Sequence, residues 1–561
     1  MTDKAKEWLR DYGFVFAVYA LVTLLTDAHY MGDTGDYADS IDAFVSKVNY
    51  KFWEFGHLLW RPFGWLIYAL FQPAVRLFTG ETDVHRNVIF TLMALNWLAG
   101  LACALLLRAF VRRVCERDWI ANLAAVCFIF THGFLNYTQT GCSYVPGLAF
   151  LLLSFYVLAR DGDKPDSTLR TSVVAGIALA GALLFWFLYL WAIPALLAVP
   201  LLLFGNGRRQ WRLAIQTAVV FTLVTGVVYA LALLHLRIFT IAELKAWISP
   251  AGAPEIKGFS RMLFGFARSF IQMGNDGMLL KRFMLRDPYS PVSLAEILSL
   301  SLWKFAFFYL FLAAVVINLL RSPKGRRVLA LFLVGAIPVI GFAIIFLGGD
   351  LERYMALYPL LFLALALSLD SPRALPQLKV LTLAFVAALI VSNSWAMAKV
   401  VLNREEETAA ARVRDLRPLL KPNSRLFTVN LHDDLLSFNR DFPLHPVNRD
   451  ANLRPWAVVT PNAPWGARWR EDFAKQVRAT WDAGGEAWIS RRAFSERPKP
   501  DWNWVEGDDP RVSWSDIYNF FAPFELGQTA GGEDGFSLLE RSPRNEQIVQ
   551  SLLSEMSPPQ H

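Results

Sequence analysis

The fold is decided between Phe14 and Ser40, where the sequence reads FVFAVYALVTLLTDAHYMGDTGDYADS. Its first half is apolar and no small-residue cleavage site follows it, so we expect a retained first membrane span rather than a signal peptide. Its last ten residues, MGDTGDYADS, carry three carboxylates, Asp33, Asp36 and Asp39. Because charged side chains are costly inside lipid, the chain must leave the bilayer before them. The stretch therefore predicts a membrane protein with an acidic loop at the membrane boundary.

The composition supports a chain with many membrane spans. Of 561 residues, 55% are hydrophobic and only 18% are charged, and the mean hydropathy is +0.34. The net charge of +7 and the pI near 9.1 would suit nucleic acid, but Lys and Arg gather at the ends of apolar runs, where they orient a membrane protein. No nucleic-acid partner is therefore expected. The four cysteines show neither disulfide-framework nor metal-ligand spacing.

Apolar runs long enough to cross about 30 Å of hydrocarbon predict the membrane spans. Eleven such runs lie near residues 9–27, 87–111, 119–136, 143–160, 171–189, 190–204, 213–236, 294–320, 328–348, 354–370 and 377–401. Two of them, 190–204 and 354–370, are short for a span. The run 57–78 carries two arginines and two prolines, and we expect it to lie along the membrane surface.

Charge bias sets the expected orientation of these spans. With the N-terminus in the cytoplasm and 57–78 on the surface, the cytoplasmic loops are rich in Lys and Arg, as in RAFVRRVCERD and RSPKGRR. The outer side, periplasmic for a bacterial inner membrane, then receives loop 28–86 with its interfacial helices, a second loop over 237–293, and the C-terminal region. Counting 57–78 as a span would place the basic loops outside.

The composition changes from apolar to mixed at about Asn403. REEETAAARVRDLRPLL and REDFAKQVRATWDAG have helical periodicity, whereas SRLFTVN and EAWIS are typical of strands. The sequence thus predicts a predominantly α-helical membrane domain over 1–402 and a small soluble α/β domain on the outer face over 403–561. Its Trp-rich stretches are expected to form the domain core, with acceptor binding as the alternative.

The acidic loop has a structural and a catalytic interpretation. Gly32 and Gly35 disfavour a helix through Asp33, so we expect a loop followed by a helix that starts near Asp36. Asp36 would then cap this helix, and Asp39 would be a capping-box or solvated acid. Alternatively, a carboxylate here removes a proton from an acceptor hydroxyl while a glycosyl phosphate bond breaks. Of these acids, Asp33 is the one least well explained by helix capping. The residue spacing alone does not show whether Asp33 or Asp36 is the base.

Three more ionisable side chains follow in the aromatic segment FWEFGHLLWRPFGW. Glu54 and His57 are three residues apart, but two ligands are weak evidence for a metal, and none is expected here. His57 therefore either forms an interfacial hydrogen bond or contacts substrate. Arg61 either snorkels to lipid head groups or binds a polyprenyl phosphate, because a guanidinium pairs well with phosphate oxygens.

The last candidate residues are Glu352, Arg353 and Tyr354, at the outer end of a predicted span in GGDLERYMALYPLL. Arg353 either anchors the helix at the interface or faces a donor phosphate, with Glu352 holding the guanidinium. Tyr354 would contact the same substrate. His132 and Tyr137, near the outer end of the third predicted span, are expected to pack in the core, with lining of the same cavity as the alternative.

In their order along the chain, these motifs resemble the GT-C superfamily of polyprenyl-phosphate-sugar-dependent glycosyltransferases, which includes protein O-mannosyltransferases and lipid A aminoarabinose transferases. GDTGDY is similar to the family's acidic motif after the first span, GHLLWRP to its His/Pro segment and ERYMALYPLL to its Arg-Tyr segment. The resemblance covers most of residues 1–400. Many relatives carry a second acidic residue between the third and fourth spans, where this chain has NYTQTGCSYVPG, so the resemblance leaves the metal cofactor unknown.

The resemblance implies transfer of a sugar from a polyprenyl-phosphate donor to a hydroxyl of a protein, glycan or lipid acceptor, on the outer face and with inversion. It implies that Asp33 or Asp36 is the base. It also implies that Arg61 or Arg353 stabilises the departing phosphate, an electrostatic role.

Two other functions stay open. A lipid-linked sugar flippase or transporter would be expected to show inverted repeats and ionisable residues deep within spans, and the sequence shows neither. An O-antigen-type polymerase or ligase of lipid-linked glycans would use basic residues of one large outer loop. Here that loop offers Lys257, Arg261, Arg268, Lys281, Arg282 and Arg286.

Overall fold

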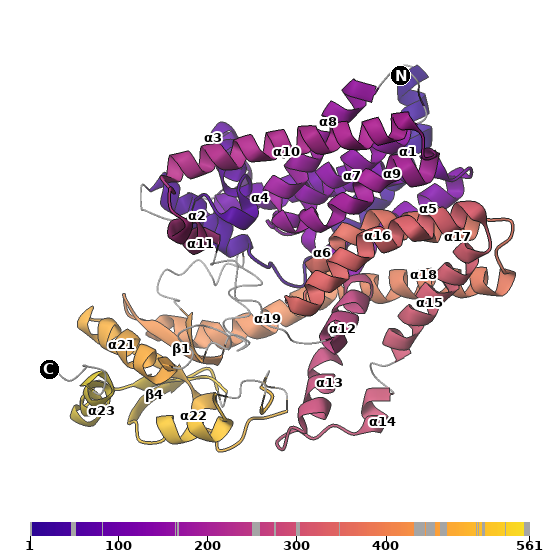
Figure 1. Ribbon diagram of the computed structural model, residues 1–561. Helices are drawn as coiled ribbons and strands as arrows, with labels where there is room; N and C mark the ends of the chain where they lie inside the picture. Colours follow the sequence, from indigo (N-terminus) through magenta and orange to yellow (C-terminus); the bar gives the residue numbers. More distant parts are fainter. Residues whose placement is uncertain are drawn as a thin grey trace. The chain divides into compact units, whose positions relative to one another are not determined.

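The computed structural model describes residues 3–46, 52–80, 82–162, 164, 168–248, 259–273, 276–298, 303–346, 348–430, 444, 455–459, 468–500, 502, 504–507, 511–532 and 534–554 (Figure 1). The chain divides into two compact units. The first comprises Met1–Met273 and Trp303–Lys399, and the second comprises Gly274–Leu302 and Val400–His561. The second unit thus combines the C-terminal region with a piece of the predicted second outer loop.

The first unit is mainly helical and apolar. Among the described residues, nine helical segments are long and apolar enough to cross a membrane. Seven of them are single helices: α4 (Val84–Val114), α7 (Tyr144–Asp161), α8 (Thr168–Phe185), α10 (Arg208–Leu236), α15 (Trp303–Leu320), α16 (Pro323–Ile345) and α18 (Pro376–Ala396). Two shorter apolar segments are Asp11–Leu25, within α1 (Asp3–Leu25), and α5 (Asp118–Ile129). The predicted multispan helical fold class is confirmed.

The helix surfaces show why this unit needs lipid around it. α10 exposes a row of large apolar side chains at steps of four residues, each at least half exposed: Ile215, Val219, Leu223, Val227 and Leu231. A four-residue step keeps side chains on one face of an α-helix. A continuous apolar stripe of this length is not stable in water, whereas hydrocarbon accommodates it.

The two predicted spans that looked short are extended by 3₁₀ turns at their starts. η2 (Phe187–Ala192) leads into α9 (Ile193–Phe204), and η5 (Leu351–Leu357) leads into α17 (Tyr358–Asp370). The combined segments have 18 and 20 residues. The two 3₁₀ turns contact each other. Of the residues in the apolar window of Leu351–Asp370, 94% are buried, so this segment forms the centre of the helical bundle.

Two predicted spans differ from the observed helices. The run 119–136 is not one helix, because α5 stops before Thr131 adopts an extended conformation and the short helix α6 (His132–Tyr137) follows. The Thr131 hydroxyl donates to the Phe128 carbonyl and thereby satisfies an acceptor at the end of α5. The run 294–320 contains a separate turn, α14 (Leu294–Ile297), and its long helix begins only at Trp303.

Short helices connect the spans on the side of the acidic loop. They are α2 (Thr34–Val45), η1 (Phe55–His57), α3 (Trp60–Thr79), α11 (Ile241–Ile248) and α12 (Phe259–Phe270). α3 covers the run that was expected to lie along the membrane surface, and it is not among the nine candidate spans. It buries Trp60, Gly64 and Tyr68 on one face. Its opposite face exposes Leu70 and Leu77, so α3 is amphipathic with an apolar outer face.

The second unit is built around a five-stranded mixed sheet. The strands are β1 (Arg425–Asn430), β2 (Pro455–Val459), β3 (Ala487–Ser490), β4 (Leu526–Ala530) and β5 (Phe536–Leu539), in the order β2-β1-β3-β5-β4. β1 pairs in parallel with β2 and β3, whereas β5 pairs antiparallel with β3 and β4. The helices of this unit are α13 (Asp276–Leu285), α14, α21 (Trp469–Asp482), α22 (Trp514–Phe521) and α23 (Pro543–Ser554), and α19 (Lys399–Leu416) leads into it. The α/β class predicted for the C-terminal region is confirmed.

The core of the second unit is rich in tryptophan, as expected. Trp469, Trp481, Trp502, Trp504 and Trp514 are all buried in one cluster. Arg282 of α13 connects that helix to this tryptophan-rich core. Its guanidinium donates to the Trp502 carbonyl at 3.0 Å and pairs with the buried Asp287 carboxylate at 3.6 Å. These contacts explain why residues 276–298 group with the C-terminal region.

Candidate active site

The acidic loop is fixed against the segment between α6 and α7. Asn136 of α6 accepts from the backbone amides of His29 and Tyr30 and donates to the Tyr30 carbonyl at 3.0 Å. The Gly141 amide donates to the Thr34 hydroxyl at 2.8 Å. The two segments are more than a hundred residues apart in sequence. They therefore form one hydrogen-bonded layer of the fold.

A glycine is required where the acidic loop turns toward α2. Gly32 has φ of 54°, a left-handed conformation that other residues rarely adopt, and an added Cβ would lie 2.9 Å from the Cys142 sulfur. α2 then begins at Thr34, two residues before the expected start, with Asp33 as its N-cap residue. The Asp33 side chain makes no capping hydrogen bond. The expectation that Asp36 caps this helix is therefore wrong.

The Asp33 carboxylate instead meets two tyrosine hydroxyls. Tyr144, at the start of α7, donates to Oδ2 of Asp33 at 2.5 Å, and Tyr37 of α2 lies 3.4 Å from the same oxygen. Asp33 is half-buried, whereas both tyrosines are buried. Hydrogen bonds from rigid aromatic side chains hold a carboxylate in one orientation. Asp33 therefore combines a fixed carboxylate with access from outside.

A third tyrosine, Tyr137, links this carboxylate to the start of η5. The Tyr137 ring lies edge-on to the Tyr144 ring, with centroids 4.8 Å apart. Its hydroxyl donates to Oε2 of Glu352 at 2.6 Å and lies 3.0 Å from the Tyr30 hydroxyl. Tyr137 was expected to pack in the core, and it is buried, but it also joins Asp33 to Glu352 through Tyr144.

Glu352 in turn holds Arg353. The Arg353 Nε lies 3.7 Å from Oε1 of Glu352, and one terminal nitrogen lies 3.3 Å from Oδ2 of Asp350. The guanidinium also lies over the Phe346 ring, 5.1 Å from its centroid. The Arg353 and Glu352 side chains are 13% and 9% exposed. A nearly buried guanidinium held in this way is a preformed cation whose position is set before any anion arrives.

A second cation, Arg61, contacts the same tyrosine as Asp33. Arg61 donates to Glu54 through one terminal nitrogen, and its guanidinium lies over the Tyr37 ring, 5.0 Å from the centroid. Arg61 is buried in the protein rather than extended along its surface. Tyr37 therefore separates Arg61 from Asp33 and contacts both.

His57 packs against the same tyrosines. Its Nδ1 lies 2.7 Å from the Ser143 hydroxyl, and its ring lies 5.4 Å from the Tyr37 ring and 6.2 Å from the Tyr144 ring, centroid to centroid. Burial lowers the pKa of His57 below its usual value of 6.5, although Glu54 acts in the opposite direction. The ring is therefore neutral at neutral pH.

This burial makes a pH-dependent stability difference testable. Because the unfolded chain takes up a proton on His57 near pH 6.5 while the folded protein does not, the free energy of unfolding should decrease as the pH falls below about 6.5. In His57→Gln this decrease should be smaller, since glutamine keeps a hydrogen-bonding group without titrating. The measurement is the thermal unfolding midpoint of the purified protein between pH 5.5 and 7.5. The exposed His235, changed to Gln, is the control, and equal slopes for wild type and His57→Gln would contradict the expectation.

Asp36 and Asp39 differ from Asp33 in their surroundings. Partial burial raises the pKa of Asp36, and the neighbouring Asp33 and Asp39 carboxylates raise it further, while Arg61 lowers it. Asp39 points away, with its side chain 60% exposed and paired with the His85 ring at 3.0 Å. Asp39 is thus a surface acid, as expected.

Not every predicted site residue lies in this cluster. Tyr354 is fully buried, and its hydroxyl lies within hydrogen-bond distance of the carbonyls of Met262 and Gly348, at 2.8 and 2.6 Å. His132 is also fully buried, with Nδ1 3.1 Å from the Arg268 carbonyl. The structure therefore assigns both side chains to packing between η5, α6 and α12.

No metal site is assembled from the residues that the structure describes. Among them, no three His, Cys, Asp or Glu side chains lie close enough together to hold one ion. Glu54 and His57 make separate contacts, with Arg61 and Ser143 respectively. The cofactor therefore stays unassigned.

Sequence reasoning missed the aromatic part of the site. Tyr37, Tyr144 and Ser143 contact the predicted residues directly but were not singled out. One signal was present, because NYTQTGCSYVPG occupies the place where relatives in the resembled family carry an acidic residue. Its two tyrosines are the two that connect Asp33 to Glu352.

Comparison with known proteins gives similarity at the level of overall architecture. No family model matches the sequence, and no curated protein does. The oligosaccharyltransferase of Archaeoglobus fulgidus aligns with a TM-score of 0.41 and 10% identity, over 86% of this chain and 68% of that chain. The arabinofuranosyltransferase AftD from mycobacteria aligns with a TM-score of 0.45 and 14% identity, over 92% of this chain but only 37% of AftD. Both are glycosyltransferases by name. At these TM-scores the function has to be argued from the chain's own residues.

Proposed function

We propose that the protein is a membrane glycosyltransferase of the GT-C type, which transfers a sugar from a polyprenyl-phosphate donor to a hydroxyl of a protein, glycan or lipid acceptor. One observation carries this proposal: a continuous series of contacts runs from Asp33 through Tyr144 and Tyr137 to Glu352 and Arg353. This series supports the proposal, because a carboxylate able to accept a proton and a largely buried cation able to pair with a phosphate belong to the same cluster.

The chemistry follows from these two groups. The acceptor oxygen forms a bond to the anomeric carbon of the sugar while the bond from that carbon to the phosphate oxygen breaks. The electron pair leaves with the phosphate, and Asp33 takes the hydroxyl proton. Arg353, with Arg61 on the other side, neutralises the charge that develops on the phosphate. A single displacement of this kind inverts the configuration at the anomeric carbon.

Asp33 is favoured over Asp36 as the base. Its carboxylate is oriented by Tyr144 at 2.5 Å, whereas partial burial and the neighbouring carboxylates raise the pKa of Asp36 and disfavour its charged form. Orientation matters because a general base must lie within hydrogen-bond reach of the proton that it removes. Asp36, close to Arg61 and Glu54, is proposed to contribute to substrate binding.

The location of the reaction rests on charge bias. Basic loops at one end of the spans indicate the cytoplasmic side, which places the acidic loop on the opposite side. We therefore propose an integral protein of the bacterial inner membrane with its N-terminus in the cytoplasm and its active site and C-terminal unit in the periplasm.

The polymerase or ligase alternative loses part of its support. Its six basic residues are divided between the two units, with Arg261 and Arg268 in the first and Lys281, Arg282 and Arg286 in the second, while Lys257 lies outside the described residues. Arg282 is also occupied by contacts inside its own unit.

The proposal is tested with the full-length protein in vesicles that contain labelled polyprenyl-phosphate sugars and an extract of candidate acceptors. A glycosyltransferase releases polyprenyl phosphate and labels an acceptor, which thin-layer chromatography and mass spectrometry detect. A flippase would move the intact donor to the other leaflet without cleaving it. A ligase would use only donors that carry a preassembled glycan on pyrophosphate. Absence of donor cleavage with every sugar tried would overturn the proposal.

Tyr144→Phe tests how Asp33 is positioned. Loss of the hydroxyl removes one hydrogen bond to a charged group, about 1.5 kcal/mol, so kcat should fall roughly tenfold. The KM for the donor should stay unchanged, because Tyr144 is proposed to act through Asp33 and not on the phosphate. Tyr309→Phe is the control. The Tyr309 hydroxyl donates to the Leu263 carbonyl at 2.7 Å, and neither residue belongs to the acidic loop. A fall in both variants, or a change confined to KM, would contradict this role.

A further inference from the structure

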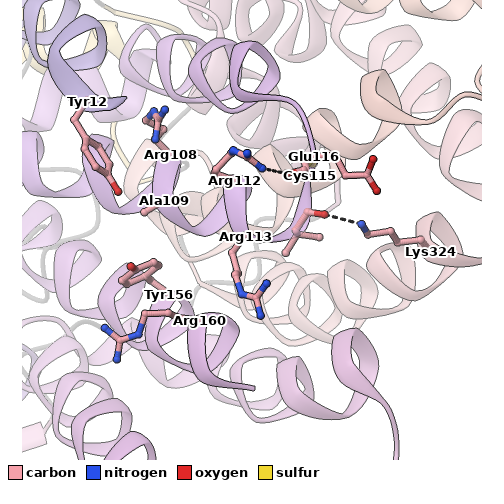
Figure 2. Close-up of a pocket in the computed structure, with 11 residues that line it drawn as sticks. Tyr12, Arg108, Ala109, Arg112, Arg113, Cys115, Glu116, Tyr156, Arg160 and Lys324 are labelled. Carbon is pink, nitrogen blue, oxygen red and sulfur yellow. Dashed lines mark hydrogen bonds between the residues drawn. The ribbon is translucent and has the colours of Figure 1, made fainter. Parts of the chain in front are cut away.

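A second candidate site lies at the other end of α4. A cavity of about 570 Å³ opens where the C-terminal end of α4 meets α1, α7 and the start of α16 (Figure 2). Asn96 of α4 donates to the carbonyls of Thr140 and Cys142 beside the acidic loop. Arg112 follows roughly 24 Å further along the same helix, at 1.5 Å per residue. The cavity is therefore separate from the candidate active site.

The lining of this cavity is strongly basic. Among the lining residues, Glu116 is the one carboxylate. Five cationic side chains line the cavity: Arg108, Arg112, Arg113, Arg160 and Lys324. They come from three helices, α4, α7 and α16, as Figure 2 shows.

Nearby carboxylates balance only part of this charge. Asp118 accepts from Arg112 at 2.5 Å and lies 3.6 Å from Arg108. Asp161 pairs with Arg160 at 2.7 Å but also with Lys164 at 2.9 Å. The five lining cations thus outnumber the three carboxylates Glu116, Asp118 and Asp161, and the lining keeps an excess of positive charge.

Aromatic rings hold the guanidinium groups apart around the cavity. Arg108 lies over the Tyr12 ring at 4.8 Å from its centroid, Arg160 over Tyr156 at 5.6 Å, and Arg113 over Phe204 at 5.9 Å. Lys324 is fixed by a hydrogen bond to the Val114 carbonyl at 2.6 Å. Guanidinium groups spread around one space present pairs of N–H donors, which match the oxygens of a phosphate.

The surroundings of the cavity are those of a membrane–water interface. Trp119 at the start of α5 and Trp211 at the start of α10 are about half exposed, and indole side chains favour the head-group level. Within α1, the exposed side chains Phe16 and Leu24 follow Tyr12 at multiples of four residues, on the same face of the helix. An apolar surface therefore continues from the basic cavity along the first span.

We propose that this cavity binds the phosphate head group of an anionic phospholipid. Basic pockets between membrane helices on the cytoplasmic side suit such head groups, and charge bias places this cavity on the cytoplasmic side. A free phosphate ion would meet the same guanidinium groups but would leave the apolar surface of α1 unused. The lipid is the favoured ligand because the cavity joins both kinds of surface. This inference is independent of the proposed transfer reaction.

The test measures bound lipid on the full-length protein. Wild type is exchanged into mixed micelles with equal amounts of phosphatidylglycerol and phosphatidylcholine, and native mass spectrometry counts the lipids retained. The variant Arg113→Gln/Lys324→Gln removes two of the five cavity charges. The control Arg326→Gln/Arg327→Gln removes two exposed charges from the same end of α16, outside the cavity.

Wild type and the control should retain phosphatidylglycerol in preference to phosphatidylcholine. The cavity variant should retain at least about fivefold less phosphatidylglycerol, since one basic residue near an anionic surface contributes on the order of fivefold in affinity. Equal retention by all three proteins would overturn the proposal, as would displacement of the lipid by millimolar inorganic phosphate. If the double variant does not fold, Lys324→Gln alone is compared with Arg326→Gln under the same criteria.

Discussion

Asp33→Asn should abolish sugar transfer while leaving the protein folded. Removal of a general base costs roughly 10²- to 10⁴-fold in rate. Asparagine keeps an oxygen that accepts the Tyr144 hydroxyl, so the contact that fixes the loop survives while the ability to take a proton is lost. The measurement is the initial rate of donor cleavage by the purified variant in vesicles, at saturating acceptor. The donor KM should change little.

Two neighbouring carboxylates provide the controls for this experiment. Asp39→Asn should transfer sugar at the wild-type rate, because Asp39 lies on the exposed face of α2 beside His85. Asp36→Asn should reduce transfer less than Asp33→Asn and should raise the thermal unfolding midpoint at neutral pH. Burial and adjacent carboxylates raise the pKa of Asp36, so its charge opposes folding above that pKa. If Asp33→Asn transferred sugar at the full rate and Asp36→Asn did not, Asp36 would be the base instead of Asp33. Full sugar transfer by both variants would contradict the proposed mechanism.

Arg353→Gln should lower both transfer and stability. Loss of one preformed group that stabilises developing charge costs roughly 10²- to 10³-fold in rate. The change also leaves the Glu352 carboxylate, which is only 9% exposed, without its guanidinium partner. Breaking one half of a buried ion pair costs about 3–5 kcal/mol. We therefore expect a large drop in the unfolding midpoint together with the loss of donor cleavage.

The double variant Glu352→Gln/Arg353→Gln separates these two effects. Removing both charges leaves no uncompensated ion, so stability should return toward wild type, while transfer should stay low because no cation faces the phosphate. Glu352→Gln alone should keep measurable transfer, since Asp350 still pairs with Arg353 at 3.3 Å. A double variant that regains both stability and transfer would show that Arg353 only anchors η5.

The features that were predictable from sequence are those that local pattern encodes. Apolar length and terminal basic residues located the spans, and periodicity located β1, α21 and β3. The break at Thr131 was not predicted in this way, because apolar residues flank Thr131, His132 and Gly133 on both sides and the mean hydropathy of the run does not report backbone direction. The 3₁₀ start of α17 was likewise hidden, since it depends on packing at the bundle centre.

The site was predictable residue by residue but not as an assembly. Asp33, Arg61 and Arg353 each stood out as charges at the edge of apolar runs. The contact between Asp33 and Tyr144 joins residues 111 positions apart, and it exists only because α6, α7 and the acidic loop pack together. Tyrosine in an apolar segment gives no sequence signal that separates such a role from ordinary core packing.

The burial of the segment Leu351–Asp370 limits what part of a donor can reach Arg353. Because 94% of the residues in the apolar window of this segment are buried, its sides offer little surface to a long isoprenoid chain. Only the phosphate and the sugar would enter the cluster around Arg353, and the tail would stay among the lipid-facing helices. Donors that differ in the number of isoprene units would then make the same contacts at the reacting phosphate, so selectivity would depend on the sugar and not on the tail length.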